Sequence, residues 1–299
     1  MDYRLITGTL RPRHWIKNSF LFAPALFTLR LFDPQVWGTL LFGFLGFSLT
    51  ASAVYAFNDI FNRREDREHP VKRLRPVASG RLKVGWAAAL AVVAFGAGMG
   101  LLAAAGSAAA GLGLVYVGLM LIYTLWLRKL LVVDVILVAS GFVVRVMTGA
   151  AIIAEPVSHW LLLCTFTVAL FLAMIKRRQE IAAAAGTVET GEVGAARTVL
   201  VKYPPLGVLD NWIAVLAGMT VLCYALYTVD PQTIAKHHTG ALIYTTPFVL
   251  YGIFRYQQLA SVGRAGEDPT GILMRDLGMK VVVLLWVGVV GVILYMARG

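Results

Sequence analysis

Residues 86–105 read WAAALAVVAFGAGMGLLAAA, and residues 108–127 read AAAGLGLVYVGLMLIYTLWL. Neither run contains a charged side chain, and each has roughly the 20 mostly apolar residues with which an α-helix crosses a bilayer. Similar runs recur along the chain of 299 residues, which is 59% hydrophobic and 14% charged. A soluble globule of this length has too little interior to bury all of them. The sequence therefore predicts an all-α, polytopic integral membrane protein.

Nine apolar segments are predicted to cross the membrane, and no stretch between them indicates a separate soluble domain. Residues 1–299 are therefore expected to form one transmembrane domain. The segments lie near residues 17–32, 36–57, 86–105, 108–127, 133–154, 158–175, 208–229, 241–262 and 278–297. The first is short and is interrupted by Pro24. Glycines that suit the close approach of helices in lipid are Gly96, Gly98, Gly100, Gly111 and Gly113.

The basic residues are unevenly distributed between the two sides of the membrane. With the N-terminus inside, 23 of the 27 lysines and arginines fall on that side, whereas Arg30, Lys236 and Arg298 fall on the other. Because Lys and Arg concentrate in cytoplasmic loops, we expect a cytoplasmic N-terminus and an external C-terminus, in the cell's inner (plasma) membrane. Membrane association and this distribution explain the formal net charge of +11. Membrane lipids are therefore expected partners, and nucleic acid is not.

A polar motif begins where the second apolar segment reaches the cytoplasmic side, because residues 58–70 read NDIFNRREDREHP. If the helix continues past the membrane, Asn58, Asn62 and Asp66 fall at i, i+4 and i+8, on one face. Side-chain oxygens at that spacing suit Mg²⁺, which prefers oxygen ligands and retains waters and substrate phosphates in its shell. The alternative is a solvated helix end with mixed charges. An Asn-Asp pair at a membrane boundary is costly without a function, however, which favours a site.

Three cations follow this motif directly, namely Lys72, Arg73 and Arg75. The planar guanidinium of an arginine can donate two hydrogen bonds to one phosphate. Since the loop adjoins a Mg²⁺-type face, it is predicted to bind phosphate. The alternative is a basic cytoplasmic loop that only fixes the orientation of the chain.

Further candidate residues lie between Tyr123 and Arg145. Lys129 lies in a short loop, and Asp134 opens the fifth apolar segment. Arg145 follows Asp134 by eleven residues, which is about three helical turns. Both are therefore expected on one face, directed into a polar cavity rather than toward lipid. A purely structural pairing of the two with each other is the alternative.

Two more motifs lie on the cytoplasmic side. The sixth segment ends in Lys176-Arg177-Arg178-Gln179-Glu180, in which Lys176 and Glu180 are i, i+4 neighbours. Lys17 and Asn18 stand at the start of the first segment. Together with residues 58–70 they predict a cytoplasm-facing cavity whose apolar floor is open to lipid. Such a cavity suits a phosphorylated polar substrate and a lipid substrate that meet at the membrane surface.

The pattern Asn58-Asp59-x-x-Asn62-x-x-x-Asp66, followed by Arg75-Pro76, resembles the UbiA-type superfamily of membrane prenyltransferases, which have nine transmembrane helices. The family usually has Asp where this chain has Asn62. The closer resemblance is to the decaprenyl-phosphate phosphoribosyltransferase branch. It rests on Arg11-Pro12-x-x-Trp15-x-Lys17-Asn18, His69-Pro70-x-Lys72-Arg73, Gly141-Phe142-x-x-Arg145, Arg255-Tyr256 and Asp268-Pro269-Thr270. The second acidic motif of aromatic prenyltransferases is absent, and Lys176-Arg177-x-x-Glu180 occupies its place.

This resemblance implies a Mg²⁺-dependent transfer of 5-phosphoribose from phosphoribosyl pyrophosphate to a polyprenyl (decaprenyl-type) phosphate, for cell-envelope glycan precursors. Asn58, Asn62 and Asp66 would hold the metal. The residues expected at the reacting centre are Asp59, Asp66, Lys129 and Asp134. Those expected to bind the substrates are Lys17, Asn18, Lys72, Arg73, Arg75, Tyr123, Arg145, Lys176, Arg177 and Glu180.

Two other functions stay open. The nearer is a UbiA-type prenyltransferase with an isoprenoid diphosphate donor and an aromatic or lipid acceptor, against which the missing second acidic motif argues. The other is a transporter or flippase for a phosphorylated lipid, against which the short and nearly uncharged outer loops argue. The prenyl chain length and the oligomeric state are also left open, and a homo-oligomer is compatible with the sequence.

Overall fold

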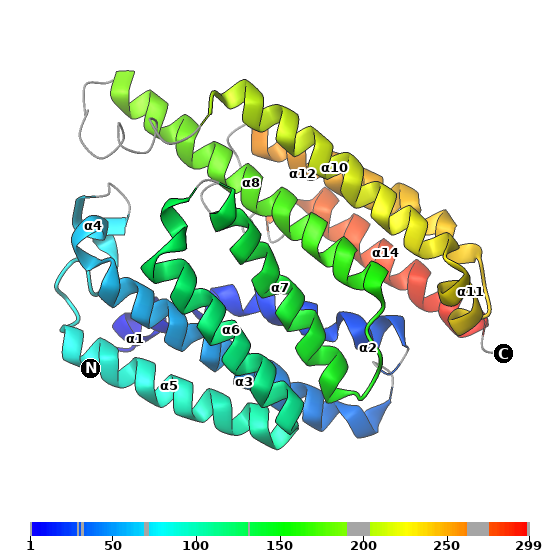
Figure 1. Ribbon diagram of the computed structural model, residues 1–299, viewed down its shortest axis with the longest axis horizontal. Helices are drawn as coiled ribbons and strands as arrows, with labels where there is room; N and C mark the ends of the chain where they lie inside the picture. Colours follow the sequence, from blue (N-terminus) through cyan, green and yellow to red (C-terminus); the bar gives the residue numbers. More distant parts are fainter. Residues whose placement is uncertain are drawn as a thin grey trace. The chain divides into compact units, whose positions relative to one another are not determined.

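The computed structural model is all-helical, with no strand among the residues that it describes (Figure 1). Those residues are 2–28, 30, 33–68, 72–130, 132–189, 204–261 and 275–297, and at 129 and 183–189 the description covers the backbone alone. The chain divides into two compact units. Unit 1 comprises Met1–Ala25, Arg30–Leu137 and Gly141–Pro156, and unit 2 comprises Leu26–Leu29, Val138–Ser140 and Val157–Gly299.

Unit 1 contains the N-terminal elements and four long helices. Its elements are α1 (Tyr3–Leu10), the 3-10 helix η1 (Pro12–Phe22), α3 (Pro34–Phe61), α4 (Arg63–Glu68), η3 (Lys72–Leu74), α5 (Val84–Ala105), α6 (Ser107–Leu125), η4 (Leu127–Lys129) and most of α7 (Val133–Ile152).

Unit 2 contains the remaining helices. They are α8 (His159–Glu189), α10 (Leu206–Val229), α11 (Pro231–His237), η5 (Ala241–Thr245), α12 (Thr246–Ser261) and α14 (Leu277–Met296). The short helix α2 (Ala23–Phe27) has residues in both units. Within unit 2, the Phe27, Tyr227 and Trp286 rings pack edge to face, with centroids 5.5 and 6.0 Å from that of Phe27.

Seven of these helices are long and apolar enough to cross a membrane, namely α3, α5, α6, α7, α10, α14 and residues His159–Ala182 of α8. They coincide with seven of the nine predicted segments, which are therefore confirmed as long apolar helices. Local signals set their ends. The Asp33 side chain caps α3 by accepting from Gln35 N, and Pro34 follows at the first helical position, where no intrahelical N–H is needed. Gly106, at φ 145°, separates α5 from α6.

The first and eighth apolar segments are each predicted as one continuous helix. The structure forms two shorter helices in place of each. In place of 17–32, the chain forms η1 and then α2, with residues 29, 31 and 32 outside the description. In place of 241–262, it forms η5 and then the 16-residue α12. A proline lies in the first turn of each α-helix, Pro24 in α2 and Pro247 in α12. Since proline lacks an N–H, it suits a helix start and not the interior of one long helix.

Helix α3 is the centre of unit 1, and glycine lets α5 approach it. A Cβ atom on Gly98 would lie 2.7 Å from the backbone nitrogen of Thr50, and one on Gly46 would lie 2.9 Å from the Gly98 carbonyl oxygen. Gly113 of α6 is also tightly packed, against the Leu102 side chain at 2.6 Å. The other predicted packing glycines have nothing within 4 Å of a built Cβ, and these are Gly96, Gly100 and Gly111.

Replacing Gly98 by alanine is therefore expected to destabilise unit 1. The added methyl group meets backbone atoms that cannot move aside, and overpacking of this kind costs about 1–3 kcal/mol. Gly100→Ala, on the same helix, is the matched control and is expected to be neutral or slightly stabilising because nothing surrounds its Cβ position. Thermal unfolding of both variants in detergent measures the difference. Equal unfolding temperatures for the two variants would contradict the close α3–α5 packing.

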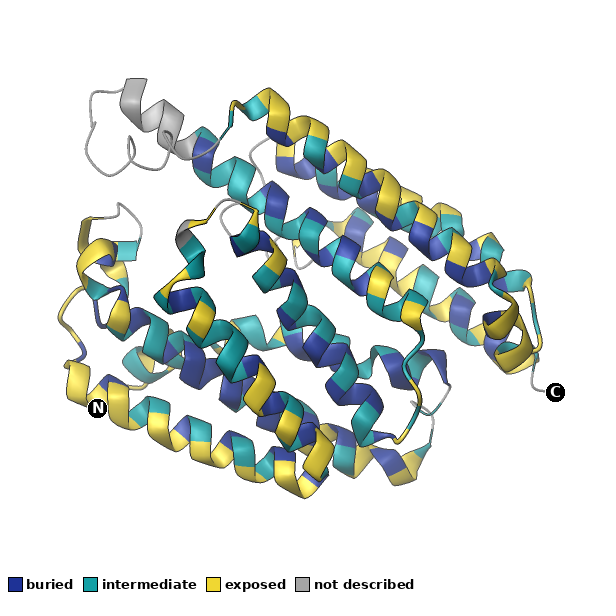
Figure 2. Cartoon of the chain, in the orientation of Figure 1, coloured by how far each residue is buried: buried dark blue, intermediate teal, exposed yellow. Residues whose placement is uncertain are grey.

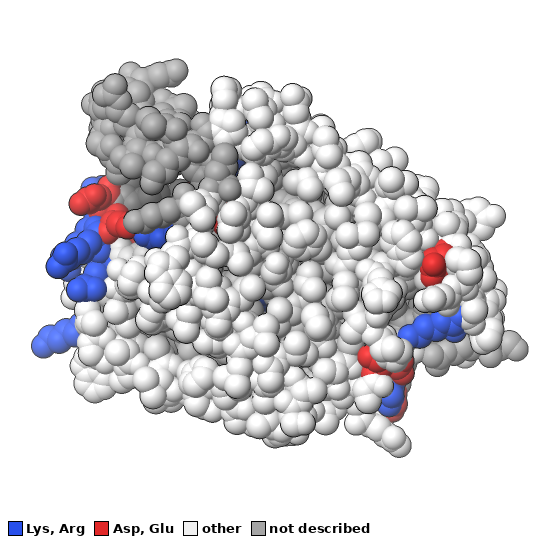
Figure 3. All heavy atoms as spheres, in the orientation of Figure 1, with Lys and Arg blue, Asp and Glu red and all other residues white. Residues whose placement is uncertain are grey.

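The outer surfaces of α5 and α6 are apolar and suit contact with lipid. Figure 2 shows α5 exposed along its outward side, where Val92 and Val93 are 70% and 68% accessible. Neither helix carries a charged residue. In Figure 3, lysines and arginines gather instead at the end of unit 1 that holds α4 and the first turn of α5. An extended apolar surface of this kind marks a membrane-contacting face.

Candidate active site

The polar motif lies where α3 passes into α4. Although α3 ends at Phe61, the helical hydrogen bonds continue, from Asn62 N to Asn58 O at 3.0 Å and from Asp66 N to Asn62 O at 2.9 Å. Asn58, Asn62 and Asp66 therefore lie on successive turns, with Asn62 between the end of α3 and the start of α4. Asn62 and Asp66 are buried, whereas Arg64, Glu65, Arg67 and Glu68 are exposed, so one side of this helix end is shielded from solvent.

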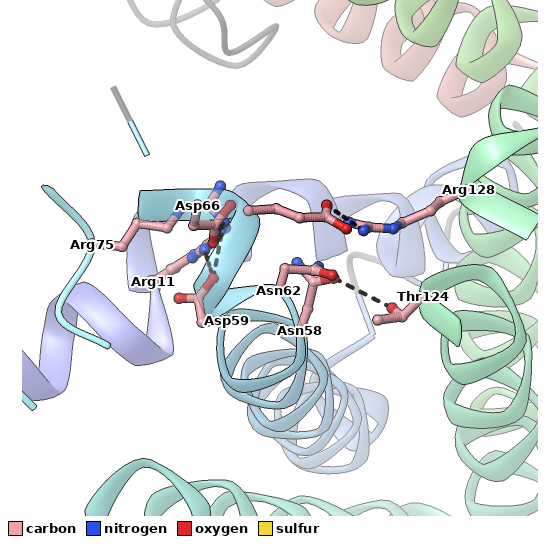
Figure 4. Close-up of polar contacts among 9 residues, drawn as sticks. Arg11, Asn58, Asp59, Asn62, Asp66, Arg75, Thr124 and Arg128 are labelled. Carbon is pink, nitrogen blue, oxygen red and sulfur yellow. Dashed lines mark hydrogen bonds and ion pairs between the residues drawn. The ribbon is translucent and has the colours of Figure 1, made fainter. Parts of the chain in front are cut away.

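Two arginines hold the two carboxylates of this motif (Figure 4). Asp59 Oδ1 accepts hydrogen bonds from Arg75 Nη1 at 3.1 Å and from Arg11 Nη2. The same Arg75 nitrogen donates to Asp66 Oδ2 at 2.8 Å. The Asp59 and Asp66 side chains are only 1% and 7% exposed, and burial of charged groups requires such partners. The result is a compact network of two negative and two positive side chains.

The asparagines lie on the other flank of the same helix end (Figure 4). Asn62 Nδ2 donates to Asn58 Oδ1 at 2.6 Å, and Thr124 Oγ1 of α6 donates to the same oxygen at 3.4 Å. Above them, Arg128 of η4 forms an ion pair with Glu65 of α4. The end of α6 and the 3-10 turn that follows it are thereby tied to the polar motif.

Two oxygens in this cluster have no protein partner, although both are buried: Asp59 Oδ2 and Asn62 Oδ1. Unpaired buried acceptors are costly, and an ion, a ligand or an ordered water would satisfy them. Among the described residues, no group of three His, Cys, Asp or Glu side chains could hold a metal ion. Mg²⁺ does not need such a group, because it binds through one or two carboxylates together with waters and substrate phosphates. The donor set of Asp59, Asp66 and the two asparagines therefore fits Mg²⁺.

The loop after α4 presents Arg75 to the carboxylates. Val77 and Leu82 are buried against Ala87, and Arg67 Nε donates to the Ala78 carbonyl oxygen at 2.9 Å. Gly80 adopts φ +77°, a conformation that other residues rarely adopt. These contacts fix the loop on unit 1.

The three cations of the loop differ in their placement. Arg75 takes part in the carboxylate network, whereas Arg73 is exposed and Lys72 is half-buried in η3. Of the three cations predicted to bind phosphate, Arg75 is therefore the one that contacts the polar motif.

Arg145 is buried in unit 1 at 4% exposure, and all three of its guanidinium nitrogens have protein partners. Nε donates to Asn18 Oδ1 at 2.7 Å, Nη1 to the Gly141 carbonyl oxygen at 2.7 Å, and Nη2 to the Tyr116 hydroxyl at 3.1 Å. Its Cζ lies 5.1 Å from the Phe47 ring centroid. Arg145 and Asn18 therefore link α7 to η1, and their predicted contact with a substrate stays a prediction.

The remaining predicted site residues of unit 1 lie on several different helices. Asp134 is buried in the first turn of α7, where its Oδ1 accepts from Val135 N at 2.8 Å. Lys17 Nζ lies 3.2 Å from His14 Nδ1 on η1. Tyr123 is half-buried near the end of α6. The Lys129 side chain lies outside the described part of the chain.

The basic motif of α8 belongs to unit 2. Lys176 Nζ lies 3.9 Å from Glu180 Oε1, as the i, i+4 spacing predicts, and Arg177 also pairs with Glu180. Arg178, which the sequence did not single out as a site residue, pairs with Asp210 of α10.

Arg11 is the member of this carboxylate network that the sequence did not single out as a site residue. The signal that could have singled it out is its place in the Arg11-Pro12-x-x-Trp15-x-Lys17-Asn18 pattern that carries the family resemblance.

The chain has relatives among known proteins. Residues 19–187 match the UbiA prenyltransferase family. The chain is 34% identical to the decaprenyl-phosphate phosphoribosyltransferase of Corynebacterium glutamicum, over 93% of this chain and 83% of the relative. It is 33% identical to the protein of the same name from Mycobacterium tuberculosis, over 96% of this chain and 93% of the relative.

A solved structure has the same fold. The UbiA homolog from Archaeoglobus fulgidus bound to DMAPP and Mg²⁺ superposes with a TM-score of 0.70 at 16% identity, covering 97% of this chain and 99% of that one. The family match and these relatives define an enzyme of the transferase class, and the long apolar helices define a multi-pass integral membrane protein. The chain belongs to the UbiA prenyltransferase family.

Proposed function

We propose that this enzyme transfers 5-phosphoribose from phosphoribosyl pyrophosphate to a polyprenyl phosphate of the decaprenyl type, with Mg²⁺ as cofactor. The observation that carries the proposal is the network of Asp59, Asp66, Arg11 and Arg75, which combines buried carboxylates with guanidinium groups. Carboxylates are ligands for Mg²⁺ and guanidinium groups are ligands for phosphate. A site that binds a diphosphate together with a metal ion needs both carboxylates and guanidinium groups. The names of the bacterial relatives support the same donor and acceptor.

The choice of donor rests on the motif in α8. A prenyl diphosphate is typically held between two acidic motifs, each of which binds Mg²⁺. Here the position of the second acidic motif is taken by Lys176, Arg177 and Glu180, of which two are cations. A basic motif suits a donor with an additional phosphate, such as the 5-phosphate of phosphoribosyl pyrophosphate. Lys129 and Asp134 are proposed to position the ribose and this phosphate.

The chemistry requires little beyond positioning. The anionic phosphate oxygen of the lipid attacks C1 of the ribose, and the bond from C1 to the pyrophosphate oxygen breaks. No general base is needed, because the lipid phosphate is already ionised near neutral pH. Lys72, Arg73 and Arg75 hold the phosphates of the donor and stabilise the charge that develops on the leaving group. When bound at Asn58, Asn62 and Asp66, Mg²⁺ supplies further neutralisation of that charge.

The lipid is proposed to enter sideways from the bilayer. Its tail follows apolar helix faces, and its phosphate lies near Lys17 and Arg145, with Asn18 and Tyr123 lining the substrate site. We further propose a cytoplasm-facing cavity in a single domain with nine membrane segments, a cytoplasmic N-terminus and an external C-terminus. The 23 lysines and arginines on one side support this orientation in the plasma membrane. Assembly into a homo-oligomer is compatible with it.

The donor can be tested directly on the purified protein in detergent. We expect incubation with Mg²⁺, phosphoribosyl pyrophosphate and a polyprenyl phosphate to give polyprenyl-phosphoryl-5-phosphoribose, detected by mass spectrometry of the lipid fraction. Removal of the metal with a chelator should stop product formation. The rival donor is an isoprenoid diphosphate, favoured by the DMAPP bound to the Archaeoglobus homolog. Prenylated product from that donor, without any phosphoribosylated lipid, would refute the proposal.

A further inference from the structure

The carboxylate network of unit 1 is electrically balanced by its own side chains. Asp59 and Asp66 contribute two negative charges, and Arg11 and Arg75 contribute two positive ones (Figure 4). Both arginines donate to the same oxygen, Asp59 Oδ1, while Asp59 Oδ2 is buried without a partner. A divalent cation that approaches Asp59 Oδ2 is therefore attracted by the carboxylates and repelled by two guanidinium groups a few ångströms away.

A metal ion that arrives bound to a diphosphate meets a different balance of attraction and repulsion. Its phosphate oxygens are strong acceptors, and a guanidinium that leaves a carboxylate can donate to them with little loss of hydrogen-bond energy. The carboxylate that is released then carries its full charge toward the metal. The same four side chains thus disfavour the bare cation and favour the cation together with a diphosphate.

Arg11 is placed for such an exchange. Its side chain is 16% exposed, so part of it is accessible to solvent. Its Cζ lies 5.3 Å from the centroid of the Tyr55 ring, a cation–π contact that does not depend on the hydrogen-bond partner. Its backbone is fixed at φ 52°, at the end of α1, with its N–H donating to Thr7 O at 2.9 Å. The side chain can therefore change partners while its base stays in place.

We propose that Arg11 is a donor-binding residue that exchanges Asp59 for a phosphate oxygen when a metal-bound diphosphate arrives. The exchange couples binding of the metal ion to binding of the diphosphate. Each of these ligands weakens the Arg11–Asp59 ion pair, and that ion pair hinders binding of the other ligand. The proposal rests on the proposed function, and it assigns to the N-terminal segment a part in binding the diphosphate of the donor.

The test compares Arg11→Gln with Arg13→Gln, which removes the same charge from an exposed side chain two residues away. The full-length proteins are purified in detergent. Binding of Mn²⁺ alone is measured by electron paramagnetic resonance, and binding of the preformed Mg²⁺–pyrophosphate complex by calorimetry. For Arg11→Gln we expect Mn²⁺ alone to bind about threefold to tenfold tighter, since a repelling charge is removed. The complex should bind about tenfold or more weakly, since a phosphate ligand is lost.

Opposite changes in the two affinities are the signature of the exchange, because a merely structural role for Arg11 would not strengthen metal binding. The Arg13→Gln protein should match the wild type in both measurements. Weaker binding of Mn²⁺ by Arg11→Gln, or an unchanged affinity for the complex, would overturn the role of Arg11. Wild-type protein that binds neither ligand would instead refute the proposed function.

Should Arg11→Gln fail to fold, Arg11→Lys answers the same question. It keeps the charge but loses the forked donor geometry. We expect wild-type affinity for Mn²⁺ and about threefold weaker binding of the Mg²⁺–pyrophosphate complex. Unchanged binding of the complex by this variant would also overturn the exchange.

Discussion

Replacing Asp66 by asparagine is expected to lower kcat/KM for the proposed transfer about a thousandfold or more, because a metal ligand and its charge are lost. Asp66 is buried, and its Oδ2 accepts from Arg75 at 2.8 Å. Asparagine has the same shape and keeps an oxygen that can accept from Arg75, so the fold should be retained. The effect is therefore expected in Mg²⁺-dependent catalysis rather than in assembly of the bundle.

The measurement is the initial rate of phosphoribosylated lipid formation, with Mg²⁺ varied at a fixed donor concentration. Glu68→Gln serves as the matched control, since it removes one negative charge from an exposed position of the same short helix. We expect the control to keep nearly the full rate. A folded Asp66→Asn protein that retained more than about a tenth of the wild-type rate would contradict a metal-binding role, given the size of effect such ligands have.

The long helices were predictable because membrane helices must be apolar throughout their length. The charge-free runs at 86–105 and 108–127 became α5 and α6 with ends within about two residues, since no tertiary contact is needed to define a helix in lipid. The first segment was less predictable. A stretch that contains Pro24 can continue or break depending on its neighbours, and here it divides into η1 and α2.

Glycine spacing predicted the kind of packing but not the residues that carry it. Gly96, Gly98 and Gly100 occur at alternate positions, yet only Gly98 meets the backbone of α3. Which side of a helix faces a neighbour depends on its rotation in the bundle. With an apolar residue at nearly every position, the sequence of α5 gives no polar side from which that rotation could be read.

The candidate site was predictable where it depends on local spacing. The i, i+4, i+8 relation of Asn58, Asn62 and Asp66 follows from helix geometry alone. The partners of these residues come from distant parts of the chain. Arg11 and Asp59 are 48 positions apart, and Asn18 and Arg145 are 127 positions apart. Since many arginines lie in the segments predicted to be cytoplasmic, composition and spacing cannot indicate which of them reaches a given carboxylate.

Replacing Arg75 by glutamine is expected to have the second-largest effect. Arg75 Nη1 bridges Asp59 Oδ1 and Asp66 Oδ2 at 3.1 and 2.8 Å, and it is proposed to bind a phosphate of the donor. Its loss leaves two buried carboxylates with Arg11 alone, which should lower the free energy of unfolding by about 1–3 kcal/mol. Loss of the phosphate contact should reduce kcat/KM by about a hundredfold.

Thermal unfolding and steady-state kinetics of the same preparation separate these two effects. Arg64→Gln is the control, since Arg64 is exposed on α4 and lies outside the network. Added Mg²⁺ is expected to recover part of the lost stability of Arg75→Gln, because the metal takes over the neutralisation of the carboxylates. A purely structural Arg75 would give a protein whose kcat/KM returned to the wild-type value once Mg²⁺ had restored its stability. Because a phosphate ligand cannot be replaced by a cation, we expect the rate to stay low in that experiment.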